Sequence, residues 1–355
     1  MTIKKPIKYS LAPQTKFYDS MGSNWKPFLM FNHFPNIRSK YCNTDKDGLR
    51  FNNFNNASNI SNSIFNEEKS ESKKTAILLG GSYAFSEGST SDANTISSYL
   101  TKKTNYNFLN LAGRGFSGYQ EIIIFMSNLN KIKNIKKIVI LSGLNDLLLS
   151  RYIKNYDETY GPIFGNNIFT EKMKETTGWK NKVFKFVFGK FFNPEKDWSK
   201  INSLNWKKEI FSKKIEKKNA LSVDSKLENT FERNFMIWST IAKGMNLNID
   251  YVLQPSSIWQ EKILSSEEEK IFNESDKMPD IQKIYESINL DKYVYLKEKL
   301  QNITKKYDIN FIDSNEILKK KCFKDWMYVD KVHMNDTGYE RVANELITNL
   351  SLTDR

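Results

Sequence analysis

The chain has few of the residues that disulfide frameworks and metal sites require. Its 355 residues include only two cysteines and two histidines. Cys42 and Cys322 stand far apart and outside any metal-ligand spacing, so we expect two reduced thiols. A zinc site of three or four ligands would have to consist mostly of carboxylates, which excludes the common zinc arrangements. We therefore predict neither a bound metal nor another cofactor.

Long apolar runs and targeting signals are also missing. No uninterrupted apolar stretch has the length, about 20 residues, that a membrane-spanning helix needs. The N-terminus is basic but is followed by neither an apolar segment nor a small-residue cleavage site. The P-loop motif and the dinucleotide-binding glycine fingerprint are absent, and so is any recognised nucleic-acid motif. We expect a cytoplasmic protein that does not bind nucleic acid.

Positive charge, by contrast, is abundant and unevenly distributed. The formal net charge is +13, and residues 171–218 contain fourteen Lys against six acidic residues. Phe and Trp residues interleave with these lysines, a combination suited to an anionic membrane surface or a lipid-linked intermediate. A solvated cationic face is the plainer interpretation, and we favour it. Peripheral membrane contact stays open as an alternative.

Short apolar runs alternate with helical patterns over much of the chain. Because strands spaced in this way are joined by right-handed crossovers, they should pair in parallel with helices on both faces. We predict a three-layer α/β/α fold of the flavodoxin-like type, with strand order 2-1-3-4-5. The strands are expected at 75–80, 107–112, 136–143, 248–255 and 309–314, and helices at 92–104 (with Asp92 as a cap), 119–132, 226–244, 281–306 and 336–350.

Two segments fall outside this alternation. Residues 1–74 are aromatic, Asn-rich and irregular, and we interpret them as an N-terminal extension. Residues 150–224 are too long for a plain loop in a compact domain, and we interpret them as a basic aromatic insertion or lid. The α/β domain would then comprise residues 75–149 and 225–355.

Chemically useful residues follow four of the predicted elements. Ser82 comes after the first strand in Gly-Gly-Ser, and Gly115 closes the turn after the second. Asn145 follows the third strand, and Asp330 and His333 lie beyond the fifth. Because the carboxyl ends of parallel strands meet at one edge of a sheet, these loops should lie close together.

This set fits nucleophilic catalysis by a serine. Ser82 needs a base, which His333 can supply, and Asp330 can hold the imidazole in the required tautomer. The glycine turns and the Asn145 amide offer N–H groups to an oxyanion. Each motif alone is weak, because Gly-Gly-Ser also fits an ordinary turn and Asp330–His333 a surface ion pair. Their joint occurrence in this order favours catalysis, and we interpret His33, which has no such context, as structural.

In these four blocks the chain resembles the SGNH (GDSL-type) hydrolase superfamily, over about residues 75–150 and 226–350. The resemblance implies that Ser82 is the nucleophile and also donates its backbone N–H. Gly115 N–H and the Asn145 side chain would complete the oxyanion hole. The first block of the family commonly reads Gly-Asp-Ser, whereas Gly81 stands here in place of the acid. The segment KDGLRFNN, which contains Arg50, resembles one found upstream in bacterial members often linked to surface-polysaccharide pathways.

Three functions stay open from the sequence. The first is hydrolysis of an acyl ester, with O-acetyl on a carbohydrate or a similar polar molecule as the expected substrate. The second is transfer of the acyl group from Ser82 to a sugar hydroxyl, which would use the same residues. The third is a module that binds an anionic surface without catalysis. Tyr83, Arg114 and Gln254 are further candidates for substrate contact, although each also fits an ordinary core or surface position.

Overall fold

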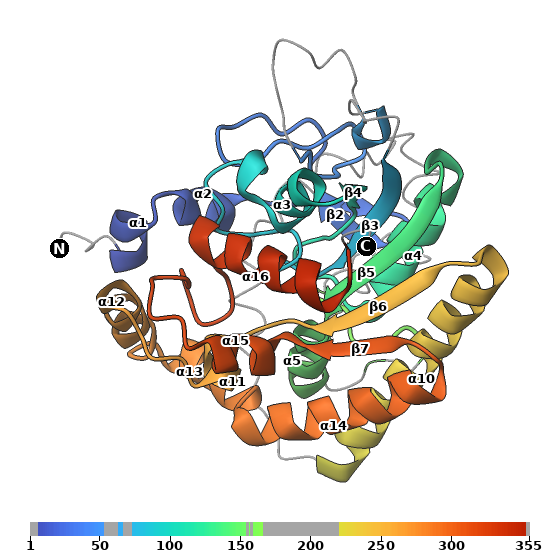
Figure 1. The fold of residues 1–355 in the computed structure, drawn as a ribbon. Coiled ribbons are helices and arrows are strands. Elements are labelled where there is room, and N and C mark those ends of the chain that lie inside the picture. Colours follow the sequence, from blue (N-terminus) through green and yellow to red (C-terminus); the bar gives the residue numbers. More distant parts are fainter. Residues whose placement is uncertain are drawn as a thin grey trace, which may run out of the picture.

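A five-stranded parallel sheet forms the centre of the molecule, a computed structural model that describes residues 6–52, 63–66, 73–153, 156, 159–165 and 220–352 (Figure 1). Its strand order is β4-β3-β5-β6-β7. This is the order 2-1-3-4-5 in chain sequence, so the predicted α/β arrangement is confirmed. The strands are β3 (Lys74–Gly80), β4 (Tyr106–Asn110), β5 (Ile135–Ser142), β6 (Asn248–Leu253) and β7 (Asn310–Asp313).

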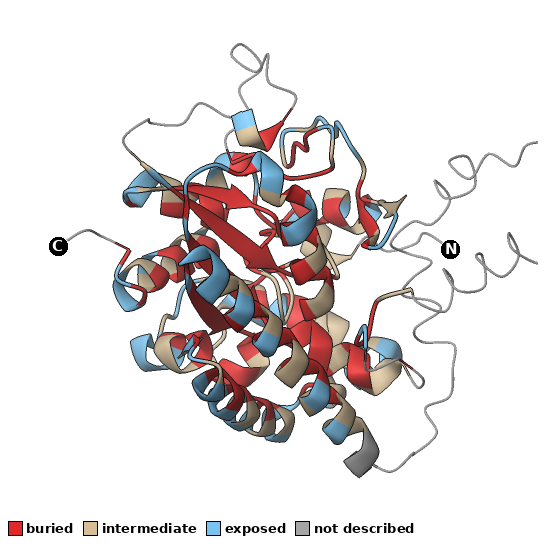
Figure 2. Ribbon diagram, turned by 90° about the vertical axis from the view of Figure 1, so that its right-hand side faces the viewer, coloured by how far each residue is buried: buried red, intermediate tan, exposed pale blue. Residues whose placement is uncertain are grey.

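Both faces of the sheet are covered by helices, which explains why the central strands β3 and β5 are mostly apolar. In β3, Ile77 and Leu79 enter the core on one face, whereas Ala76 and Leu78 enter the core on the other. Figure 2 shows the strands as a buried layer between helices whose outer sides are exposed. The first face carries α4 (Gly118–Asn128), α5 (Leu144–Tyr152), α10 (Ala220–Met245) and α14 (Leu290–Lys306), and the second α3 (Ile96–Lys103), α15 (Ser314–Lys321) and α16 (Asp336–Asn349).

Three shorter helices follow β6 and were not predicted as separate elements. They are α11 (Ser257–Gln260), α12 (Ser266–Ser275) and α13 (Pro279–Ser287). The single helix predicted at 281–306 is therefore two helices. The chain breaks at Ile288, and the Asn289 side chain accepts a hydrogen bond from the Lys292 N–H to begin α14.

The expected cap of the helix at 92–104 is also different. Thr95, not Asp92, caps α3, because its side chain accepts the Ser98 N–H at 3.2 Å. Asp92 is buried one turn earlier, where its carboxylate pairs with the Arg50 guanidinium at 3.0 Å. A charge partner distant in sequence therefore determines the position of this carboxylate.

The N-terminal segment, expected to be irregular, contains helices α1 (Ile7–Leu11) and α2 (Gln14–Ser20) and the hairpin of β1 (Ser23–Lys26) and β2 (Met30–His33). It contributes side chains to both cores of the sheet, and a single turn of 3₁₀ helix, η1 (Ile64–Asn66), follows. The buried members are Tyr18, Met21, Leu29, Phe31, Cys42, Leu49 and Phe51.

Most of the predicted insertion at 150–224, including the Lys-rich residues 171–218, lies outside the described residues. Its interpretation as a lid or as a cationic surface stays a prediction. Among the helices that the structure describes, none combines the length and the apolar character that crossing a bilayer requires.

Candidate active site

The turn after β3 presents Ser82 at the carboxyl edge of the sheet. Gly80 ends the strand with φ of +145°, and a Cβ at this position would overlap the Leu141 carbonyl oxygen. Only glycine fits there, so the chain can turn sharply against β5. The turn is then closed by Phe85 N–H donating to Gly81 O and Glu87 N–H donating to Ser82 O, each at 3.0 Å.

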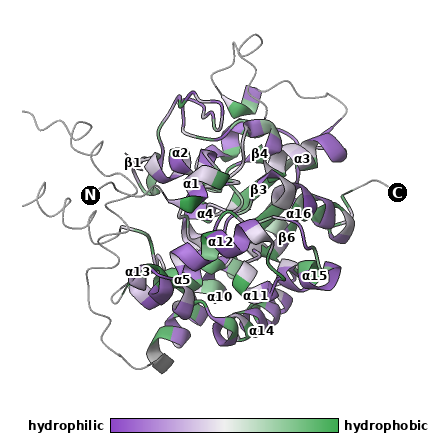
Figure 3. Cartoon of the chain, turned by 90° about the vertical axis from the view of Figure 1, so that its left-hand side faces the viewer, coloured by the Kyte–Doolittle hydropathy of each residue, from purple (hydrophilic) through white to green (hydrophobic). Residues whose placement is uncertain are grey.

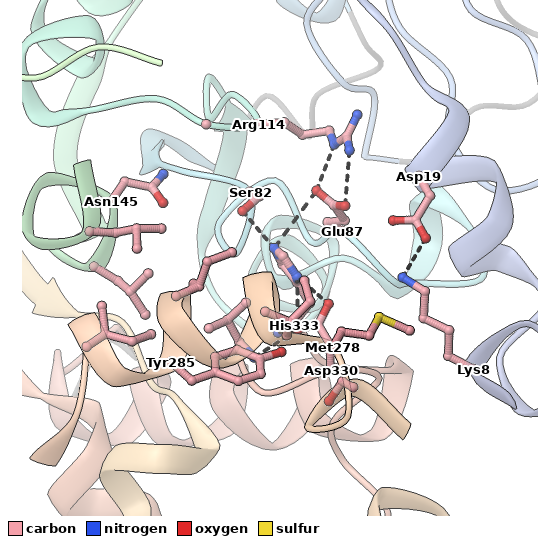
Figure 4. Close-up of a pocket in the computed structure, with 18 of the residues that line it drawn as sticks. Lys8, Asp19, Ser82, Glu87, Arg114, Asn145, Met278, Tyr285, Asp330 and His333 are labelled. Atoms are coloured by element: carbon pink, nitrogen blue, oxygen red, sulfur yellow. Dashed lines mark hydrogen bonds and ion pairs between the residues drawn. The ribbon is translucent and has the colours of Figure 1, made fainter. Parts of the chain in front are cut away.

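Ser82, His333 and Asp330 form a continuous chain of hydrogen bonds (Figure 4). The Ser82 Oγ lies 2.7 Å from His333 Nε2. On the other side of the ring, Nδ1 lies 2.9 Å from Asp330 Oδ2. The three side chains come from the turn after β3 and from the loop before α16, so the structure brings together the residues that the sequence separates by about 250 positions.

The loop that carries the histidine is held in shape by its own backbone. Asp330 Oδ1 accepts the N–H groups of Val332 (2.9 Å) and His333 (2.7 Å). The loop closes where Val329 N–H donates to His333 O at 2.9 Å. Asn335 then caps α16 by accepting the Gly338 N–H. His333 therefore stands on a short, tightly bonded loop and has few alternative positions.

Charge around the imidazole favours its protonated form. Burial lowers the pKa of His333, but the Asp330 carboxylate and, to a smaller extent, the Glu87 carboxylate outweigh burial, so the pKa is raised. Burial likewise opposes ionisation of Asp330, yet His333 and Lys8 hold the pKa of this carboxyl well below its usual range. Asp330 is thus ionised at neutral pH and can stabilise an imidazolium.

Ser82, Gly115 and Asn145, the three residues expected to form an oxyanion hole, line one cavity. Within the described residues, neither Ser82 N–H nor Gly115 N–H donates to a backbone carbonyl. Gly115 has φ of +78°, and a Cβ there would lie 3.1 Å from the Phe164 ring, so the position favours glycine. The Asn145 amide, at the start of α5, donates one N–H to Phe116 O at 2.8 Å. Its second N–H stays available to a ligand.

Gly81, where the SGNH family commonly has aspartate, provides space for this amide. A Cβ at position 81 would overlap Asn145 Nδ2. The φ of Gly81 is not in the left-handed region. The glycine is therefore explained by the close approach of the Asn145 side chain rather than by backbone strain.

Glu87 is a site residue that the sequence analysis missed. Its carboxylate lies 3.9 Å from His333 Nε2 and binds the Arg114 guanidinium through two hydrogen bonds, at 2.7 and 3.1 Å. Burial opposes its ionisation, but Arg114 and then His333 lower the pKa of Glu87 to about 2. Its position in the sequence, five residues after Ser82, could have indicated that Glu87 lies close to the site.

The second histidine supports the loop of Gly115 and is not part of the reactive set. His33 Nε2 accepts the Arg114 backbone N–H at 3.0 Å, and Nδ1 donates to Gly48 O at 3.1 Å. Burial, with the nearby Arg114, lowers the pKa of His33 to about 3. A neutral ring is required because Nε2 must accept.

A cavity of about 450 Å³ opens onto Ser82 and His333. At one end its wall is polar and comes mainly from α1, α2 and the Glu87–Arg114 pair. At the other end, below Asn145 in Figure 4, the wall is apolar and comes from α5 and α13. The side of the molecule that carries α1, α12, α13 and α5 faces the viewer in Figure 3.

The three further candidates for substrate contact have different positions. Arg114 and Gln254 line the cavity. Tyr83 does not: its side chain is fully buried, its hydroxyl donates to Met334 Sδ at 2.9 Å, and its ring packs edge-on against Tyr339. The residue that follows Ser82 therefore belongs to the core. In the described part of the chain, no three His, Cys, Asp or Glu side chains are grouped as a metal site requires.

Comparisons with known proteins give similarity in structure only. No protein-family model matches the chain, and no curated protein matches its sequence. A similar solved structure is the acetyl xylan esterase AlAXEase, with 12% identity, a TM-score of 0.37, and coverage of 78% of this chain and 99% of that chain. A lipolytic G-D-S-L family protein from Veillonella parvula DSM 2008 has 12% identity, a TM-score of 0.40, and coverage of 78% and 98%.

A two-domain esterase active on acetylated mannans is also similar, with 10% identity, a TM-score of 0.38, and coverage of 79% of this chain and 48% of that chain. The similar structures are thus esterases and a GDSL-type lipolytic protein, the class that the sequence motifs resemble. At such identities and TM-scores the function has to be argued from the geometry of the site.

Proposed function

We propose that the chain is an SGNH-type serine esterase that cleaves an acyl ester through an acyl-Ser82 intermediate. The observation that carries this proposal is the hydrogen-bonded chain from Ser82 Oγ through His333 to Asp330, at 2.7 and 2.9 Å. A serine paired in this way with a histidine, itself oriented by a carboxylate, is the arrangement that activates a hydroxyl as a nucleophile.

The steps follow from the positions of the atoms. Ser82 Oγ attacks the ester carbonyl carbon while His333 Nε2 takes the hydroxyl proton. The carbonyl oxygen becomes an oxyanion that the N–H groups of Ser82, Gly115 and Asn145 bind. When the C–O bond of the alcohol breaks, His333 returns its proton to the leaving oxygen. Water then attacks the acyl-Ser82 ester by the same route and releases the acid.

The polar end of the cavity supports an uncharged, hydroxyl-rich alcohol such as a carbohydrate. Its charged groups already have partners: Lys8 pairs with Asp19 at 2.5 Å, Arg114 pairs with Glu87, and Glu274 accepts the Ile7 N–H at 2.7 Å. An anionic substrate would have to compete with these carboxylates for the cations. Hydroxyl groups can instead add hydrogen bonds to such pairs without leaving a buried charge unpaired.

Replacing the nucleophile tests the proposal. Ser82→Ala is expected to lower kcat/KM for nitrophenyl and acylated-sugar esters by at least about 1,000-fold, the usual effect of deleting a nucleophile. An alkyl phosphonate should label Ser82 in the unmodified protein. Cys322→Ser, which removes the exposed thiol eleven residues before His333, serves as the matched control and should retain activity. Labelling of another residue, or unchanged activity in Ser82→Ala, would refute the proposal.

Acyl transfer is the alternative outcome for the same intermediate. In the presence of a sugar acceptor, the acyl group would then appear on the sugar while acid release falls in proportion. We expect hydrolysis, that is, an amount of released acid that does not change with acceptor concentration. Product analysis by mass spectrometry over a range of acceptor concentrations distinguishes the two reactions.

A further inference from the structure

Among the described residues, helix α13 has an apolar face that the core covers only in part, through Tyr285. Ile281, Ile284 and Tyr285 lie at the spacing of one helix face. An amphipathic helix normally buries this face, yet none of the residues of α13 is buried. These three side chains line the cavity instead. The apolar surface of the helix therefore faces the cavity, and only Tyr285 also packs against the core.

Helix α5 provides the opposite wall of this apolar space. Leu144, Leu148 and Leu149 line the cavity from α5, and Ile288 and Val332 add apolar lining. Leu144 directly precedes Asn145, the side-chain donor of the proposed oxyanion hole. The apolar end therefore starts beside the position of the ester carbonyl. We call this space, between α5 and α13, the acyl chamber.

The two ends of the cavity can be assigned to the two halves of an ester. His333 Nε2 must return its proton to the leaving alcohol, and Glu87 lies 3.9 Å from that nitrogen. The alcohol oxygen therefore lies toward Glu87, Arg114 and the polar end. The acyl carbons, on the other side of the carbonyl, would then extend past Asn145 into the acyl chamber, whose side chains come from α5 and α13.

The apolar lining of the acyl chamber is larger than an acetyl group can cover. Leucine and isoleucine side chains from two helices line it, and the whole cavity, with its polar end, has a volume of about 450 Å³. An acetyl group has three non-hydrogen atoms and would leave the isoleucine and leucine side chains of the acyl chamber in contact with water. Each additional methylene buried there contributes a favourable apolar contact.

We propose that the acyl chamber selects a medium-length fatty acyl group rather than acetate. This inference rests on the proposed esterase function and specifies its substrate class: the medium-chain acyl ester of a polar alcohol. The chamber fixes the length of the chain, and the polar end of the cavity receives the alcohol.

A series of nitrophenyl esters from acetate to dodecanoate, used below micelle-forming concentrations, tests the inference. The kcat/KM should rise by up to about fourfold per methylene, the effect of burying one CH₂, and reach its maximum between hexanoate and decanoate. A series that falls from acetate onward, while Ser82 still reacts with the phosphonate, would overturn the inference and leave the esterase proposal intact. Loss of all ester cleavage would instead refute the esterase proposal.

A bulky substitution in the acyl chamber gives a second measurement. Ile284→Trp should lower the octanoate-to-acetate ratio of kcat/KM at least tenfold, because the indole occupies the path of the chain. The neighbouring Lys283→Trp, on the exposed side of α13, should leave that ratio unchanged. If Ile284→Trp does not fold, Leu148→Trp from the opposite wall serves instead. An equal loss for both esters would contradict the assignment.

Discussion

At the imidazole, two carboxylates face one ring from opposite sides. Asp330 is bonded to Nδ1, and Glu87 lies 3.9 Å from Nε2. Burial lowers the pKa of His333, but the two carboxylates raise it above its ordinary value of 6.5. The base must be neutral to accept the Ser82 proton, so activity is lost as the pH falls through this raised pKa and is complete above it.

Neutralising Glu87 should move this pH dependence. In Glu87→Gln, the negative charge near Nε2 is lost, and the positive charge of Arg114 is no longer neutralised. Both effects lower the pKa of His333. The acid limb of the kcat/KM profile is therefore expected at lower pH than in the unmodified protein. Glu340→Gln, at the surface of α16, is the matched control. If the acid limb of the profile stays at the same pH, Glu87 does not affect the pKa of His333.

The glycine beside the nucleophile gives a second prediction at the residue scale. Gly81→Ala places a methyl group where Asn145 Nδ2 now lies, so the amide has to move. We expect kcat/KM to fall about 10- to 100-fold, toward the cost of losing one oxyanion donor. Gly81→Asp, which restores the common family residue, should be at least as harmful.

Thermal unfolding should change little in Gly81→Ala, because the displaced atom ends a flexible side chain. Gly244→Ala, a helix position with nothing within 4 Å of the added Cβ, is the control and should retain full activity. A fully active Gly81→Ala variant would contradict the role assigned to this glycine.

At the scale of the secondary-structure elements, the N-terminal segment stabilises the turn that carries Ser82. The Arg50 side chain is completely buried and pairs with Asp92 at 3.0 Å. It also donates to Phe85 O (2.8 Å) and Ser86 O (3.1 Å), both in the turn that follows Ser82. The Arg50 guanidinium thus connects the N-terminal segment to the turn after β3 and, through Asp92, to the turn that precedes α3.

Removing this guanidinium should destabilise the fold. Arg50→Met leaves the Asp92 carboxylate buried without its cation, and we expect the free energy of unfolding to fall by about 3–5 kcal/mol. Adding Asp92→Asn should recover part of the loss. Arg341→Met, which breaks a partly exposed pair with Asp325, should cost no more than about 1 kcal/mol. Urea unfolding compares these variants, and equal losses for Arg50→Met and Arg341→Met would contradict the role of Arg50.

Local signals in the sequence predict the positions of the five strands well, because each contains a short apolar run. The loops that carry Ser82, Gly115, Asn145 and His333 follow predicted elements, and the parallel topology brings them to one cavity. The break between α13 and α14 was not predicted, because one apolar pattern continues across Asn289. Glu87 and the Arg50–Asp92 pair were missed because their significance depends on partners 27 and 42 positions away.

At the scale of the whole molecule, two buried acids next to the sheet make stability depend on pH. Burial, with the nearby Asp146, raises the pKa of Glu121 to about 8, and burial raises that of Asp146 to about 6. Glu121 accepts the Ser142 hydroxyl at 2.5 Å. The folded state therefore holds protons that the unfolded chain releases at lower pH. Stability falls as pH rises from about 4.5, the unfolded value, to about 8.

Replacing Glu121 by its neutral isostere should flatten this dependence. Glu121→Gln is expected to be more stable than the unmodified protein at pH 8, by about 2 kcal/mol or more, since one pKa unit corresponds to about 1.4 kcal/mol. At pH 5 the two proteins should be similar. Glu298→Gln, on the exposed side of α14, should change neither value. Urea unfolding at pH 5 and pH 8 measures the difference, and an unchanged slope would show that Glu121 is ionised in the folded state.

The two-ended cavity could not be foreseen from the sequence. It requires α1, at the start of the chain, to lie against α12, and α13 to lie against α5. These contacts join residues that are more than a hundred positions apart, and no local pattern encodes them. The sequence consequently predicted the residues that line the cavity near Ser82, whereas the shape of the cavity depends on tertiary contacts.

The supports of the site come from the first fifty residues as much as from the sheet. His33 accepts the backbone N–H of Arg114, the Ile7 N–H binds Glu274 of α12, and Arg50 holds the turn after Ser82. A chimera that received only the sheet and its helices would carry the reactive side chains without the groups that fix their loops. The smallest part of this protein that we expect to keep the site in shape is therefore the sheet with its helices together with the N-terminal segment.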